Sequence, residues 1–235
     1  MNIDWKIYDD ACKEREGDWL ILDETLYGLC RDNPRHSDIG AVRAKVWIIG
    51  RTYATQIERQ ISSDGSVGNS MDKLARHLHE HHEMVDGIFD KVRNVREPLE
   101  DEEKDFLSIV AAHGELVSLI QRQRLLRNNN SPHSFVSKYM HFHCPVVPIY
   151  DSNAKRALRK LVPWQPSFDS FKPPSKDDEE YRYFVRRFLE LYLEVRKVKS
   201  DVTVRLLDIF LLLWWRKCDK CQTSRISKDR HNGTP

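Results

Sequence analysis

The sequence predicts an all-α, compact helical domain. Apolar residues recur at spacings of three and four along 39–57 and 181–195, which places them on one face of a helix. Strand signals are sparse: the best, 146–150, lies between Pro145 and Asp151 and is equally well explained as an extended connector. The 235 residues, 40% of them hydrophobic, are enough to bury a core.

The same periodicity defines the individual elements. We expect helices at 18–31, 39–57, 70–93, 102–126, 134–143, 152–162, 181–195 and 202–217. Gly50 lies inside the second of these and permits another element to approach closely. The Ser- and Gly-rich segment 62–69 and the proline-rich segment 162–178 are expected to be loops.

The chain is expected to form one domain over 1–218, followed by a disordered polar tail over 219–235. From Lys220 onward only Ile226 is apolar. The run Leu206–Trp215 contains Asp208 and is shorter than the roughly 20 apolar residues that span a bilayer. We therefore interpret it as a core helix and expect no membrane partner.

Charge and cysteine usage restrict the class of protein further. The 38 basic and 36 acidic side chains nearly balance, so net charge favours no particular partner. The five cysteines are scattered and odd in number, which does not suit a disulfide framework. The first residues lack an apolar leader. These features predict a cytoplasmic protein.

The segment 131–158 contains the strongest indication of chemistry. A polar loop and a short helix lead to Pro148-Ile149-Tyr150-Asp151, and a basic helix follows at once. Asp151 is well placed to cap that helix, because its carboxylate can accept hydrogen bonds from free backbone N–H groups. The same carboxylate, if it faces a cleft, can stabilise developing positive charge or activate a water molecule.

This segment resembles the helix-hairpin-helix superfamily of DNA base-excision glycosylases, most closely its adenine-mismatch branch. ProIleTyrAspSerAsnAlaLysArgAlaLeu matches the part of the family motif that carries a catalytic aspartate, here Asp151. The family places a lysine or serine 18 positions earlier, and this chain has His133 there. The turn over 128–131 lacks the glycines of the family hairpin. The resemblance implies a glycosylase-like core with its catalytic segment over 128–162.

The resemblance implies a monofunctional DNA glycosylase without a cofactor. Asp151 would stabilise the sugar cation, and His133 would orient water or the base after a damaged or modified base flips out of the duplex. His133 lacks the amine of a Schiff-base enzyme, unless Lys138 substitutes for it. Five residues separate the two, about 140° around an ideal helix, so one faces a cleft more easily than both.

Further site residues follow from the same resemblance. The nucleic-acid-binding residues would be Asn130, Ser131, Ser134, Lys155, Arg156 and Arg159. The stripe of basic residues over 155–160 can equally be an ordinary solvated face. The base pocket would include Gln56, Tyr150 and His141. His141 and its neighbour His143 can instead be structural or surface residues.

Two clusters could in principle bind a metal. His77 and His81 are four residues apart on one helix face, among four histidines over 77–82, but a third ligand is not evident. A solvated face is the favoured interpretation. Cys218 and Cys221 form a CxxC pair without the two further cysteines of the family's iron–sulfur loop. We therefore expect no metal site.

Two alternatives to the glycosylase remain open. The chain can be a nucleic-acid-binding module that keeps this fold without catalysis. It can also be a helical domain that binds a small molecule or a protein, in which Asp151 is only a helix N-cap.

Overall fold

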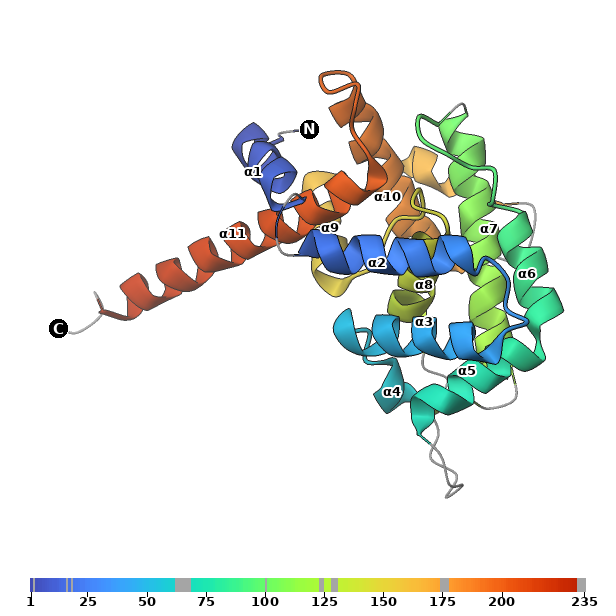
Figure 1. The fold of residues 1–235 in the computed structure, drawn as a ribbon. Coiled ribbons are helices and arrows are strands. Elements are labelled where there is room, and N and C mark those ends of the chain that lie inside the picture. Colours follow the sequence, from blue (N-terminus) through green and yellow to red (C-terminus); the bar gives the residue numbers. More distant parts are fainter. Residues whose placement is uncertain are drawn as a thin grey trace.

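Every regular element in the described part of the chain is a helix, as predicted (Figure 1). The computed structural model describes residues 1, 3–15, 17, 19–61, 69–99, 101–122, 125–127, 131–173 and 178–231, with side chains to residue 218 except that of residue 19. An isolated antiparallel bridge joins Ile61 to Leu126. The helices are α1 (Trp5–Arg15), α2 (Trp19–Asp32), α3 (Ile39–Thr52), α4 (Ile57–Gln60), α5 (Ser70–Glu80), α6 (His82–Asp90), α7 (Glu102–Gln121), α8 (His133–His143), α9 (Ser152–Leu161), the 3-10 turn η3 (Pro166–Ser170), α10 (Glu179–Arg196) and α11 (Val204–His231).

Helix α8 lies at the centre of the fold and packs against α2, α3 and α7 (Figure 1). Its residues from Phe135 to Phe142 are all buried, including Ser137, Lys138 and His141. Buried polar groups are nearly always hydrogen-bonded. Ser137, Lys138 and His141 each bond a group on another segment, and these bonds organise the elements around α8.

The remaining helices form a shell around this centre. Helix α9 packs against α10 and α11, α1 against α11, α10 against α7, and α3 against α5. Helix α11 extends away from the body toward the C-terminus (Figure 1). Side chains beyond Cys218 lie outside the described part, so the disordered tail stays a prediction. Within the described residues, no helix combines the length and the apolarity needed to cross a membrane.

Helix α3 ends earlier than the apolar pattern predicts. The expected helix over 39–57 stops at Thr52, because Ala54 and Gln56 adopt left-handed backbone conformations with φ of 50° and 56°. The buried Thr55 hydroxyl donates to the Gly50 carbonyl at 3.0 Å, which satisfies a carbonyl at the helix end. At Gly50 itself a side chain would collide with Met71 of α5, so the predicted close approach is confirmed.

Two other expected helices also differ in extent. The segment 70–93 forms α5 and α6, because His81 leaves the helical conformation and its ring Nδ1 bonds the His77 carbonyl at 2.9 Å. The segment 102–126 is helical only to Gln121, since Arg122 is extended and leads to the bridge of Leu126. Residues 62–68 and 174–177, which belong to the two expected loops, lie outside the described part.

The connector between α8 and α9 does not pair as a strand, and its first part is a turn in which Val147 N donates to the Cys144 carbonyl at 3.0 Å rather than the expected extended segment. Its buried backbone is instead bonded by side chains, as an unpaired buried segment requires. The Val147 carbonyl accepts from His141 at 2.8 Å and the Pro148 carbonyl from Tyr181 at 2.8 Å, while Ile149 N donates to Asp208 at 3.3 Å and Tyr150 N to Ser137 at 2.9 Å. These four bonds fix the position at which Asp151 begins α9.

Candidate functional site

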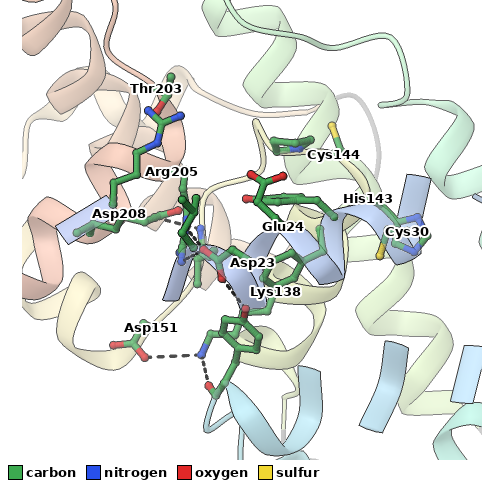
Figure 2. Close-up of a pocket in the computed structure, with 18 of the residues that line it drawn as sticks. Asp23, Glu24, Cys30, Lys138, His143, Cys144, Asp151, Thr203, Arg205 and Asp208 are labelled. Atoms are coloured by element: carbon green, nitrogen blue, oxygen red, sulfur yellow. Dashed lines mark hydrogen bonds and ion pairs between the residues drawn. The ribbon is translucent and has the colours of Figure 1, made fainter. Parts of the chain in front are cut away.

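A cavity of about 940 Å³ lies between α2, the end of α3, α8, the start of α9 and α11 (Figure 2). Its volume falls within the range of small-molecule sites, roughly 300–1,000 Å³. Lys138 of α8 and Asp151 both line it. Of the three residues that the sequence analysis assigned to catalysis, the structure therefore brings two together.

The two oxygens of Asp151 have different surroundings. Oδ1 accepts from Asn153 N at 2.8 Å, so the predicted N-cap of α9 is confirmed. Oδ2 lies 3.9 Å from Lys138 Nζ, and the side chain is 30% exposed (Figure 2). Capping therefore occupies one oxygen and leaves the other directed at the lysine and the cavity.

Lys138 is a buried cation held by three different elements. Its Nζ donates to the Tyr53 carbonyl at 2.7 Å and to Ser134 Oγ at 3.2 Å, and it faces Asp151 (Figure 2). Burial lowers the pKa of Lys138, against the opposing effect of Asp151 and Asp208. The early end of α3 is what turns the Tyr53 carbonyl toward this ammonium group.

A buried ion pair continues the network toward α2 and α11. The Tyr53 hydroxyl donates to Asp23 Oδ1 at 2.5 Å, and Arg205 Nε donates to Asp23 Oδ2 at 3.0 Å. Both carboxylate oxygens of Asp23 are thus engaged, and Asp23 is buried. This arrangement fixes Tyr53 and Arg205 at the cavity wall rather than leaving Asp23 free for chemistry.

Aromatic rings form another part of the wall. The ring of Phe142 lies 5.0 Å from that of Tyr27 and 4.9 Å from that of Tyr53, and all three residues line the cavity. The Tyr27 hydroxyl and His141 Nε2 are 2.6 Å apart. Since His141 Nδ1 donates to Val147, Nε2 is the acceptor for Tyr27. Such rings present an apolar face for stacking.

Asp208 lines the cavity, although in the sequence it stands out only because it interrupts an apolar run. Its Oδ1 accepts from Ile149 N, whereas Oδ2 has no hydrogen-bond partner among the described residues. Burial raises the pKa of Asp208 well above its usual value. The sequence does indicate Asp208 as a candidate, because a carboxyl group on an otherwise apolar helix face is buried only with a partner or a function.

His133 does not share the cavity with Asp151. It begins α8, and its Nδ1 lies 2.5 Å from Asp178 Oδ2, while its ring stacks near His113 of α7. The separation of about 140° between His133 and Lys138 on the helix is the reason only one of them reaches the cavity. His113 and Asp178, far apart in sequence, were not among the candidates.

The three expected base-pocket residues lie outside the cavity wall. Gln56 is exposed at the start of α4. Tyr150 points toward α10, where its hydroxyl donates to Glu180 at 2.5 Å. His141 is fully buried behind Tyr27, so its interpretation as a surface residue is wrong and the structural one is confirmed. His143 borders the cavity from the end of α8.

The expected nucleic-acid-binding residues are divided between two places. Asn130 lies outside the described residues. Near the start of α8, Ser131 Oγ is 3.2 Å from His133 Nδ1, and Ser134 accepts from Lys138. These two serines therefore take part in interactions within the fold.

The basic stripe of α9 is partly engaged by its neighbours. Lys155 donates to Glu180 at 2.6 Å and to the Tyr150 hydroxyl at 2.7 Å. The guanidinium of Arg156 lies 5.7 Å from the ring of Trp215 on α11. Arg159 is exposed. Lys160 Nζ also lies 4.9 Å from the ring of Trp215, so α10 and α11 hold three of the four cations and the stripe is not a simple solvated face.

The histidines over 77–82 use their ring nitrogens within the fold. His77 is buried, so the expectation of a solvated face is wrong at this position. Each of the four rings donates to a backbone carbonyl: His77 to Leu119, His79 to His36, His81 to His77 and His82 to His79. Cys221, the second cysteine of the CxxC pair, has no described side chain.

Comparisons with protein-family models, with curated proteins and with solved structures find no match to this chain. The resemblance to helix-hairpin-helix glycosylases therefore rests on the residues of 131–158 themselves.

Proposed function

We propose that this protein is a monofunctional, base-excision-type DNA glycosylase with Asp151 as its catalytic carboxylate. The observation that carries the proposal is the pairing of Asp151 Oδ2 with the buried Lys138 at the wall of a cavity of about 940 Å³. A carboxylate in this position can stabilise the positive charge that develops on a sugar when its bond to a base breaks.

Lys138 acts in this proposal as a positioning residue. Its Nζ already donates to the Tyr53 carbonyl and to Ser134, so it is held as a donor beside Asp151. The ammonium group faces Asp151 Oδ2 at 3.9 Å, so it orients the carboxylate toward the site at which a sugar cation would form. A water molecule, rather than the amine, would then attack the sugar carbon, and no covalent enzyme–DNA intermediate would form.

The cavity wall suits a flat, polar base. Tyr27, Tyr53 and Phe142 offer ring faces for stacking. Glu24 and Asp208, which also line the cavity, offer oxygens for the polar edge of a flipped base. On the outside, the exposed Arg159 would contact DNA phosphates. The free thiols of Cys12, Cys30, Cys144 and Cys218 fit the proposed cytoplasmic location.

The test is release of bases from duplexes that carry damaged or mismatched bases. Asp151→Asn should reduce release by about 100-fold or more while binding persists. Asn still caps a helix, so the variant tests charge rather than folding. Asp101→Asn is the matched control, because Asp101 caps α7 through Lys104 N at 3.1 Å, and it does not line the cavity.

Other outcomes assign other functions. A borohydride-trapped adduct that disappears in Lys138→Gln would replace the water mechanism by an amine mechanism. Salt-sensitive binding without base release in the wild type would indicate a non-catalytic nucleic-acid-binding module. Absence of binding at low salt would exclude a nucleic-acid partner.

The second candidate function is a domain that binds a small molecule. One observation favours it: seven basic and six acidic side chains line the cavity, a balance that does not select a polyanion. These residues are Arg15, Arg31, Arg93, Arg96, Lys138, Arg205 and Arg216, with Glu14, Asp23, Glu24, Glu97, Asp151 and Asp208. Thermal-shift screening with nucleosides and free bases would distinguish it, since stabilisation without DNA binding supports this function.

A further inference from the structure

A second cluster of polar side chains lies outside the cavity, where α7, the start of α8 and the start of α10 meet. His113, His133 and Asp178 each direct one ligand atom into this cluster, and the three atoms lie within 4.8 Å of one another. The residues are 20 and 45 positions apart in the chain, so no sequence motif indicates them. We infer that they form a binding site for a divalent transition metal, with Zn²⁺ as the best fit.

His113 is the residue whose surroundings most require a ligand. It is completely buried, and neither of its ring nitrogens has a hydrogen bond of normal geometry among the described residues. An imidazole binds a metal through an unprotonated ring nitrogen, and the ring nitrogens of His113 have no hydrogen-bond partner among the described residues that would compete with a metal.

Asp178 can bind a metal without giving up its role in the fold. Its Oδ1 caps α10 by accepting from Tyr181 N at 3.1 Å. Its Oδ2 lies 2.5 Å from His133 Nδ1 and 3.9 Å from His113 Nδ1. Two ligands of one tetrahedral Zn²⁺ lie about 3.3 Å apart, so both distances need to change by less than about 1 Å.

The contacts around the three ligand residues are of the kind that holds metal-binding histidines in place. His133 Nε2 lies 3.5 Å from Glu180 Oε2, so a carboxylate would support the ring while Nδ1 binds the metal. Glu180 in turn accepts from Tyr150 and Lys155. The ring of Tyr181 stacks on His113 with centroids 3.6 Å apart. Three protein ligands leave the fourth position for water.

Such a metal would stabilise the fold, because its ligands come from three helical segments separated in sequence. The inference does not depend on the glycosylase proposal, since His133 of the cluster and Lys138, which faces Asp151, project from different faces of α8. The two can therefore fail independently.

The test is Zn²⁺ titration of chelator-treated protein, with bound metal and thermal unfolding as readouts. Wild type should take up one equivalent, and its Tm should rise by about 5–10 °C at a hundredfold excess over Kd. His113→Leu and Asp178→Asn should both lose this equivalent and the rise in Tm. His113→Leu should unfold no earlier than wild type without metal, because it removes an unpaired buried imidazole.

The matched control is His79→Gln, which changes a half-buried histidine of α5 whose ring bonds the His36 carbonyl. This variant should keep the full equivalent and the rise in Tm. The assignment of this site would be overturned if both cluster variants took up Zn²⁺ as wild type does. It would also be overturned if His79→Gln lost uptake equally, or if the wild-type protein took up no Zn²⁺. If His113→Leu fails to fold, Asp178→Asn alone decides, since asparagine preserves the cap of α10.

Discussion

Lys138 Nζ lies 3.9 Å from Asp151 Oδ2, and this pair joins the central helix α8 to the first turn of α9. The distance exceeds that of a hydrogen bond, so the two groups interact through their charges. The lysine is nearly inaccessible and the aspartate is partly open to the cavity. Attraction between them is therefore less screened than at the surface, and it orients the free carboxylate oxygen.

Lys138→Met should lower base release by about 100-fold, because the carboxylate of Asp151 loses the cation that orients it. Its effect on stability should be smaller, within about 2 kcal/mol. The Tyr53 carbonyl loses a donor, but a buried charge is also removed. Urea unfolding and single-turnover base release measure the two effects.

The matched control for this variant is Lys91→Met. Lys91 pairs with Glu115 at 2.6 Å and is half exposed. Its removal should leave base release unchanged. The free energy of unfolding should change by less than about 0.5 kcal/mol. An equal loss of release in both variants would contradict a specific role for Lys138.

Ser137→Ala should destabilise the protein by about 1–3 kcal/mol. The hydroxyl accepts from the buried Tyr150 N, and alanine leaves that N–H without its acceptor. Ser170→Ala removes a hydroxyl that donates to the Ser167 carbonyl on an exposed turn, so it should cost less than about 0.5 kcal/mol. Chemical unfolding of both variants checks this, and equal effects would show that the connector is not held by Ser137.

Asp23→Ala should be among the most destabilising single changes at the cavity, by about 3–5 kcal/mol. It leaves the largely inaccessible Arg205 without its ion-pair partner and the Tyr53 hydroxyl without its acceptor. Asp10→Ala breaks a surface pair with Lys217, and its effect should be much smaller, because solvent screens this pair. Thermal unfolding of the two variants provides the comparison, and a small effect at Asp23 would contradict the buried network.

Acid should destabilise the protein through His141. Burial is the main cause that lowers its pKa to about 3, so the folded chain stays neutral while the unfolded chain takes up a proton near pH 6.5. The free energy of unfolding should therefore fall as pH decreases from about 6.5 toward about 3, by about 1.4 kcal/mol per pH unit for this residue.

Urea unfolding between about pH 7 and about pH 5 measures this dependence. His141→Gln should be less stable at neutral pH, because the Tyr27 hydroxyl and the Val147 carbonyl lose their partner. Its dependence on pH should be shallower than that of the wild type by about the stated slope. A variant with an unchanged slope would show that His141 titrates normally in the folded chain.

Local sequence determined the helices and the cap at Asp151. Periodicity reports which face of a helix is apolar, and a cap depends on backbone groups two or three residues away, so both are readable along the chain. Helix ends were less accurate where tertiary contacts intervene. The end of α3 depends on Thr55 returning to Gly50, and apolar spacing does not record such a bond.

Only the tertiary structure decided which polar residues meet. Lys138, rather than His133, reaches Asp151, because the turn of α8 relative to α9 and the position of the Tyr53 carbonyl are set by packing between helices. The association of His133 with His113 and Asp178 has the same origin. Contacts between residues far apart in sequence arise from how helices pack, and the order of residues within one segment carries no record of them.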